Sequence, residues 1–227
     1  MVTLPVAKEK IQHLVKVLEK LFPDVKGPSE REPFKVLVRA VLSQNTNFKN
    51  EREAYLRLKQ RIGTTPQALA NASEEDIADC IRVAGLYRIR AKRIKRLAEI
   101  VVKKYGGSLD SILSKPTEEA RKELLTLPGV GFKTADIILL FCAGKPVMPV
   151  DTHITRISKR LGIVKENAGY EEIRRVYEDF LPPGLHERVH LQLIMFGRSL
   201  CKAKNPKCNV CPLKSLCDFY VKKSKIS

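Results

Sequence analysis

Apolar residues recur at intervals of three and four positions through most of the 227-residue chain. This spacing places them on one face of an α-helix, whereas a strand buried on one face would alternate apolar and polar residues. No clear alternating run and no Asn-Gly hairpin signal is found. The pattern therefore predicts an all-α protein with helices over residues 11–21, 33–42, 51–62, 66–71, 74–83, 88–105, 118–125, 132–143, 152–161, 170–181 and 185–200. In the helix 88–105, the residues expected to face inward are Ile89, Ile94, Leu97, Ile100 and Val101.

The stretch 127–141 joins a tight turn directly to an apolar helix. Gly129 and Gly131 lie two residues apart after Pro128, so the turn can adopt positive φ and leaves its backbone uncovered. The helix that follows presents N–H groups and a positive dipole end, which together bind anions. With the helix 118–125, which Thr117 is expected to cap, this predicts a helix–hairpin–helix unit that can hold a nucleic-acid phosphate without reading sequence. An ordinary turn between packed helices is the alternative.

Lys133 falls in the first turn of that second helix, where the helix dipole disfavours a cation. The same field favours the neutral amine, which makes Lys133 a candidate nucleophile. A solvated phosphate contact is the simpler alternative for this lysine.

Asp151 stands just before the helix 152–161 and is expected to be its N-cap. A carboxylate in that position can also face a cleft. There it could stabilise the oxocarbenium-like sugar that remains when a nucleobase leaves. For His153, two residues on, a structural hydrogen bond is the preferred interpretation.

The net charge is +17, which predicts a polyanionic partner, either nucleic acid or an anionic membrane surface. No apolar run approaches the length of a membrane span, and the N-terminal residues lack the apolar core of a signal peptide. We therefore expect an intracellular protein, cytoplasmic or nucleoid-associated and of prokaryotic type, whose six cysteines are not disulfides.

Four of those cysteines lie within seventeen residues near the C-terminus, at Cys201, Cys208, Cys211 and Cys217. Such a group in an intracellular chain indicates a metal site, and the spacing leaves structural Zn²⁺ and an iron–sulfur cluster both open. A redox Cys-x-x-Cys would leave Cys201 and Cys217 unexplained. The loop between the first two cysteines carries Lys202, Lys204 and Lys207, which we interpret as a phosphate clamp. Cys80 and Cys142 fall in helices and are expected to be buried core thiols.

Three motifs in order resemble the endonuclease III family of helix–hairpin–helix DNA glycosylases: LPGVGFKTA at 127–135, VDTH at 150–153 and the cysteine spacing at 201–217. The likeness extends from Pro33 to Cys217. It implies two helical domains flanking a DNA-binding cleft. A helical barrel over residues 27–145 would carry the helix–hairpin–helix, and residues 1–26 with 146–227 would form the cluster domain. It also implies a [4Fe–4S] cluster on the four cysteines, with Lys133 as nucleophile and Asp151 as the essential carboxylate.

The resemblance further implies which residues contact DNA. In the family a polar residue in the stretch matching Leu42–Asn47 and a leucine matching Leu86 fill the hole left by the flipped base. Either Gln44 or Asn45 could be that polar residue, and Leu86 could instead be a core leucine. Gly129 and Gly131 would anchor the backbone. Phe132 departs from the pattern, because many members have a basic residue before the lysine.

The implied function is base excision repair of oxidised pyrimidines of the thymine glycol type in duplex DNA. The enzyme would remove the base and cleave the strand 3′ to the abasic site by β-elimination, acting as a monomer on damaged or abasic double-stranded DNA. Two alternatives remain open: a glycosylase of the same superfamily acting on mismatched or alkylated bases, and a DNA-structure-binding module without chemistry.

Overall fold

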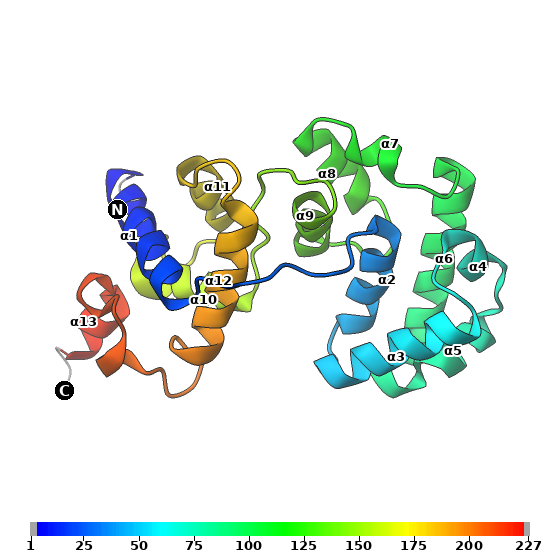
Figure 1. Cartoon of the computed structure of the whole chain (residues 1–227), viewed down its shortest axis with the longest axis horizontal. Coiled ribbons are helices and arrows are strands. Elements are labelled where there is room, and N and C mark those ends of the chain that lie inside the picture. The colour runs from blue at the N-terminus through cyan, green and yellow to red at the C-terminus, as the bar shows by residue number, and fades with distance from the viewer. Residues whose placement is uncertain (1–3, 225–227) are drawn as a thin grey trace. The chain divides into compact units, whose positions relative to one another are not determined.

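The computed structural model describes residues 4–224, and these form thirteen α-helices, three short 3-10 segments and no strand (Figure 1). The predicted all-α class is therefore confirmed. None of the helices in this described part of the chain is both long and apolar enough to cross a membrane. The α-helices are α1 Leu4–Leu21, α2 Pro33–Ser43, α3 Phe48–Arg61, α4 Pro66–Asn71, α5 Glu74–Ile81, α6 Tyr87–Tyr105, α7 Asp110–Leu113, α8 Thr117–Leu125, α9 Phe132–Phe141, α10 Thr152–Leu161, α11 Tyr170–Phe180, α12 His186–Ser199 and α13 Asp218–Ser224.

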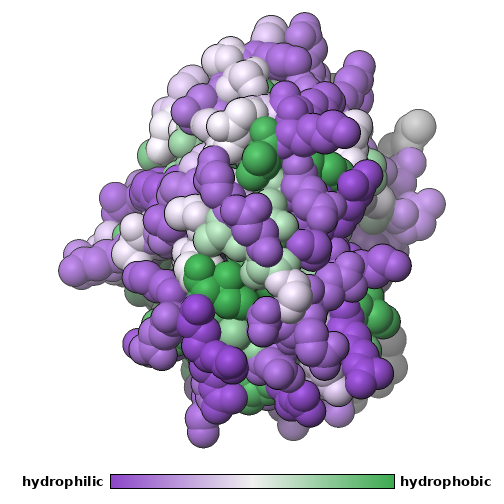
Figure 2. All heavy atoms as spheres, turned by 90° about the vertical axis from the view of Figure 1, so that its right-hand side faces the viewer, coloured by the Kyte–Doolittle hydropathy of each residue, from purple (hydrophilic) through white to green (hydrophobic). Residues whose placement is uncertain are grey.

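The chain divides into two compact units, which we call the central unit (Pro28–Lys145) and the terminal unit (Met1–Gly27 with Pro146–Ser227). In the central unit, α6 packs against α4 and α5, and α8 packs against α9. The apolar positions that the three- and four-residue spacing picks out become its core, among them Leu37, Val41, Ile94, Leu97 and Ile138, all fully buried. The face turned to the viewer in Figure 2 is mostly hydrophilic, with hydrophobic residues confined to small patches.

The terminal unit brings together segments from the two ends of the chain. Helix α1 packs against α11 and α12, and α10 packs against α12 and α13. Residues of α1, among them Ile11, Leu14 and Leu18, share one apolar core with residues of α10, α11 and α12. Three of the C-terminal cysteines pack against the edge of that core, so the cysteine segment is fixed to the helices by apolar contact.

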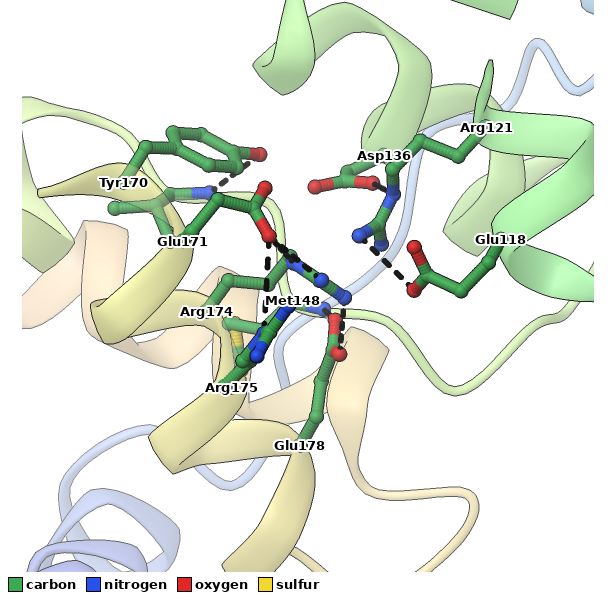
Figure 3. A network of polar contacts seen from close by, with 10 residues as sticks. Glu118, Arg121, Asp136, Met148, Tyr170, Glu171, Arg174, Arg175 and Glu178 are labelled. Carbon is green, nitrogen blue, oxygen red and sulfur yellow. Dashed lines mark hydrogen bonds and ion pairs between the residues drawn. The ribbon is translucent and has the colours of Figure 1, made fainter. Parts of the chain in front are cut away.

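Each unit also contains an ion pair with a buried arginine (Figure 3). In the central unit, Arg121 of α8 pairs with Asp136 of α9 at 2.7 Å, and both side chains are at most 3% exposed. In the terminal unit, Arg174 of α11 is 3% exposed and pairs with Glu178 of the same helix. Glu178 also accepts from the backbone N–H of Met148, so α11 holds the segment that leads to α10.

The structure corrects three expectations about single residues. Thr117 is the first residue of α8 and not its cap, which is Pro116 without a side-chain hydrogen bond. Ile89 was expected to face inward, but it is 61% exposed because it lies on the outer face of α6. Cys142 is half-buried, since it follows the end of α9, whereas Cys80 is buried as expected.

The ends of some helices also differ from the expected bounds. The helix predicted over residues 74–83 ends at Ile81 and continues as a 3-10 turn, Arg82–Ala84. The helix predicted over 132–143 ends at Phe141. Two short helices, α7 and α13, carried too few apolar positions to be predicted from spacing.

Candidate functional site

One of the two glycines in the hairpin between α8 and α9 has the positive φ that the sequence predicted. Gly129 has φ of +83°, in the left-handed region that favours glycine. Gly131 has an extended backbone with φ of −99° and is the N-cap of α9. Gly131 has no side chain with which to cap this helix. A helix N-terminus preceded by glycine can bind an anion through backbone N–H groups.

Lys133 is exposed at the second position of α9, two residues after Gly131. Phe132 before it is 48% exposed, although it is a large apolar side chain. The Lys133 side chain is therefore accessible to a ligand held at the hairpin. On the buried side of the same helix, Asp136 ties α9 to α8 through Arg121, which fixes the helix that carries Lys133.

Gln44 is tied to the hairpin. Its Nε2 donates to the carbonyl oxygen of Gly129 at 3.1 Å, and its Oε1 accepts from Nη1 of Arg93 at 2.8 Å. A methyl group added at Gly129 would come within 2.4 Å of Cδ of Arg93, so the arginine stem lies against the hairpin backbone. Both polar ends of the Gln44 side chain are thus occupied within the protein.

Arg90, one turn before Arg93 on α6, is 3% exposed and binds two turns of the backbone near the hairpin. Its guanidinium donates to the carbonyl oxygens of Ala84, Gly85 and Gln44. Burial lowers the pKa of Arg90, and the nearby charge of Arg93 lowers that pKa further. An arginine still stays charged at neutral pH. The two arginines therefore join the turn after α2 to the start of α6.

Asn45 and Leu86 project from that joined region. Both have left-handed backbones, with φ of 52° and 47°, an uncommon conformation for residues other than glycine. Asn45 is exposed and Leu86 is 59% exposed. The alternative that Leu86 is a core leucine is therefore wrong. A strained backbone that exposes a large apolar side chain is a feature found at functional sites.

Asp151 lies in the terminal unit and caps α10 as predicted, since its Oδ1 accepts from the N–H of Ile154 at 2.8 Å. This cap uses one of the two oxygens of the half-buried carboxylate. His153 contacts Arg156 through Nδ1 at 3.0 Å, and a methyl group added at Gly197 would come within 2.6 Å of the same nitrogen. These contacts are the structural ones that were expected of His153.

The four C-terminal cysteines line one cavity, beside the end of α12. Among residues 4–224, no three His, Cys, Asp or Glu side chains are grouped so that they could hold a single metal ion. Burial raises the pKa of both Cys211 and Cys217, and the other cysteines raise these pKa values further. Bound metal cations would reverse that effect, since they favour the thiolate.

Arg160 organises the loop between the first two cysteines. Its guanidinium donates to the carbonyl oxygens of Lys202 and Ala203 at 2.7 and 3.1 Å and stacks on the ring of Phe219. Its Nη1 also lies 3.6 Å from Sγ of Cys201. The carbonyls of the loop therefore point to Arg160. The loop's three lysines are exposed, and these are Lys202, Lys204 and Lys207.

The structure thus brings Gln44, Asn45, Leu86 and the hairpin glycines into one connected region, and it gathers the four cysteines beside the lysine loop. Lys133 belongs to the central unit and Asp151 to the terminal unit. Sequence reasoning missed Arg90, Arg93 and Arg160, because a basic residue that binds carbonyl oxygens looks the same in a sequence as one that binds phosphate.

Two family models match the chain. Residues 38–183 match the HhH-GPD superfamily of base excision DNA repair proteins, and residues 201–217 match the iron–sulfur binding domain of endonuclease III. Among curated proteins, endonuclease III of Thermotoga maritima is 41% identical over 95% of each chain. Endonuclease III of Bacillus subtilis is 36% identical over 85% of this chain and 84% of its own.

Solved structures agree with these sequence matches. A trapped covalent intermediate of endonuclease III with DNA has a TM-score of 0.84 at 33% identity and covers 99% of this chain and 100% of its own. A thermostable thymine-DNA glycosylase has a TM-score of 0.81 at 25% identity over 95% of this chain and 98% of its own.

Proposed function

The chain belongs to the endonuclease III family of base excision DNA repair glycosylases, and on that premise we propose that it removes oxidised pyrimidines from duplex DNA and cleaves the resulting abasic site. Its cofactor is a [4Fe–4S] cluster, which excludes the zinc alternative. We assign the cluster to Cys201, Cys208, Cys211 and Cys217. The observation that carries the proposal is an exposed Lys133 at the second position of a helix that glycine precedes.

Phosphate binding at the hairpin would place the sugar next to Lys133. The backbone N–H groups at the start of α9 would attract the phosphate, and Gly129 and Gly131 let the DNA backbone approach. Neutral Lys133 would attack C1′ of the damaged nucleotide and displace the base. The C1′–O4′ bond then breaks, which opens the sugar ring and leaves a Schiff base between Nζ and C1′. Loss of a C2′ proton follows, and β-elimination breaks the bond from C3′ to the oxygen of the 3′ phosphate.

Asp151 would stabilise the positive charge that develops on the sugar as the base leaves, or would assist Lys133 by accepting its proton. The catalytic role of Asp151 can be tested separately from its role in folding. The helix cap needs only Oδ1 of residue 151, which an asparagine also has, whereas the catalytic role needs the negative charge.

Removal of a damaged base from the stack costs less than removal of a normal one, since it pairs and stacks poorly. Asn45 and Leu86 would fill the space left in the duplex. Leu86 is exposed, and Arg90 joins the turn before Leu86 to the turn that carries Asn45. Lys202, Lys204 and Lys207 would hold a second stretch of the DNA backbone by charge. The cluster would hold the two ends of that loop together through Cys201 and Cys208.

Borohydride trapping tests the lyase step. The protein is incubated with duplex DNA that carries thymine glycol or an abasic site, and borohydride reduces the Schiff base to a permanent protein–DNA link. We expect an adduct with the wild type and with Lys103→Gln, an exposed lysine on α6, and none with Lys133→Gln. An adduct that persists in Lys133→Gln would disprove the role of Lys133.

Asp151→Asn provides the second arm. We expect it to slow base removal at least about a hundredfold, which corresponds to about 2.7 kcal/mol of transition-state stabilisation. Binding to uncleavable abasic DNA and the melting temperature should stay within the error of wild type. A normal rate of base removal would reduce Asp151 to a helix cap.

Because the chain is similar to a thymine-DNA glycosylase, mismatched and alkylated bases are tested as alternative substrates. Duplexes with thymine opposite guanine and with an alkylated purine are compared with the thymine glycol duplex at equal enzyme concentration. The proposal requires thymine glycol to be released with the highest kcat/KM. Release of none of these bases would favour a DNA-structure-binding module.

Light scattering of the free protein tests the separate prediction that it is a monomer.

A further inference from the structure

Arg93 differs from the other cations at the start of α6 in what it contacts. Its Nη1 donates to Oε1 of Gln44, and its Cδ lies where a side chain at Gly129 would have to be placed. Lys92, its neighbour on the helix, is exposed. Arg93 therefore sits between the hairpin and the turn after α2, and its guanidinium is engaged by a protein acceptor.

Gln44 closes the connection, because its Nε2 donates to the carbonyl oxygen of Gly129. Arg93, Gln44 and Gly129 thus form a three-membered arrangement, which we call the Arg93 relay. Two of its contacts are hydrogen bonds of 2.8 and 3.1 Å, and the third is the packing of the arginine stem on glycine. A side chain at residue 129 would break the packing, so glycine is needed there for contact as well as for its positive φ.

The relay ends at the residue that would enter DNA. Asn45 follows Gln44 directly and is held at φ of 52°, and the carbonyl of Gln44 is itself bound by Arg90. The Gln44 side chain cannot reach into a duplex without giving up both of its partners. Asn45 is exposed, so its amide is the one that the turn presents.

We propose that the Arg93 relay is a positioning device, which couples phosphate binding at the hairpin to insertion of Asn45 into the helix opposite the damaged base. The inference rests on the proposed function, since it assigns the insertion step of that reaction. Arg93 then contributes through Gln44 and makes no phosphate contact of its own. Gln44 acts as the connection and Asn45 as the inserted residue.

Fluorescence of 2-aminopurine can report insertion separately from catalysis. The base is placed opposite a tetrahydrofuran abasic analogue, which has no aldehyde for Lys133 to attack. Unstacking by an inserted side chain raises the fluorescence. Affinity for the same duplex is measured by anisotropy at several salt concentrations, because the slope of log K against log salt reports the number of phosphates neutralised.

Arg93→Met keeps the alkyl stem and removes the guanidinium. We expect it to lose most of the fluorescence rise and to bind about tenfold more weakly, with an unchanged salt slope. Lys92→Met removes the same charge from the neighbouring exposed position and should keep the wild-type fluorescence rise. Gln44→Leu should reproduce the loss seen in Arg93→Met, and the double variant should be no worse than either single variant. Arg93→Lys, which can still donate to Oε1 of Gln44, should recover part of the signal.

A wild-type fluorescence rise in Arg93→Met, with a salt slope reduced by about one unit, would show that Arg93 is a phosphate contact and would overturn the relay. A wild-type rise in Asn45→Ala would overturn the choice of Asn45. Melting temperatures of all variants exclude loss of the fold. Failure of the relay leaves borohydride trapping by the wild type intact, whereas a wild type that inserts a side chain but forms no adduct would refute the lyase function alone.

Discussion

Breaking the ion pair between Arg121 and Asp136 from one side should be among the more destabilising single changes in the central unit. Asp136→Asn removes the charge from a fully buried carboxylate and leaves Arg121 buried at 3% exposure. Breaking a buried pair from one side costs about 3–5 kcal/mol. Glu118, 3.3 Å from Arg121 but 61% exposed, neutralises part of the remaining charge. We therefore expect about 3 kcal/mol, or a melting temperature lower by about 6–12 °C for a chain of this size.

Differential scanning calorimetry at one scan rate measures the change, and the chain offers a matched control. Arg82 and Asp79 are also 2.7 Å apart, but their side chains are 62% and 43% exposed. Asp79→Asn should therefore leave the melting temperature close to that of the wild type. Replacing both members of the buried pair, as Arg121→Met with Asp136→Leu, should recover most of the stability lost in the single variant. Equal melting temperatures for Asp136→Asn and Asp79→Asn would refute the argument that burial decides the cost.

Three further predictions concern the glycine, cysteine and histidine environments. Gly162→Ala should lower the melting temperature more than Gly144→Ala. Both glycines have positive φ, but a methyl group at residue 162 would come 1.9 Å from the Asp218 carboxylate, whereas nothing lies within 4 Å at residue 144. Burial raises the pKa of the Cys142 thiol from 9.0 to about 12, so the thiolate fraction at pH 8 is about a thousandfold lower than in the unfolded chain, and iodoacetamide should label Cys142 only after denaturation. Burial lowers the pKa of His186, so the folded state binds fewer protons than the unfolded state. The stability present above the unfolded pKa of about 6.5 is lost as pH falls through the folded pKa, and His186→Gln should make melting less dependent on pH in this range.

Helix positions could be predicted because they depend on residues close together in the sequence. The apolar spacing placed Leu37, Val41, Ile94 and Leu97 on buried faces, and all four are fully buried. Ile89 did not follow this rule, because it is 61% exposed while the next residue, Arg90, is buried. The cap at Asp151 was predictable for the same reason as the helices, because its hydrogen bond spans only three residues.

The contacts that shape the candidate site could not be predicted, since they join residues far apart in the sequence. Gln44 meets Gly129 85 residues away and Arg93 49 residues away. From the sequence, Gln44 and Asn45 were equivalent candidates for insertion. The three-dimensional contacts distinguish them, because one side chain has two internal partners and the other is exposed.

The same distinction changes what the net charge of +17 means. Several cations bind backbone carbonyl oxygens at or near the C-terminal ends of helices, where the helix dipole favours a positive charge. These are Lys10 at Leu161, Arg31 at Phe141 and Lys95 at Ala70 and Ala72. Arg90 and Arg160 bind carbonyls of turns and loops in the same way. A cation held by a carbonyl stabilises the fold and releases no counterion when DNA binds. The salt dependence of DNA binding should therefore follow the exposed lysines of the cysteine loop and the start of α6, and it should be shallower than the net charge implies.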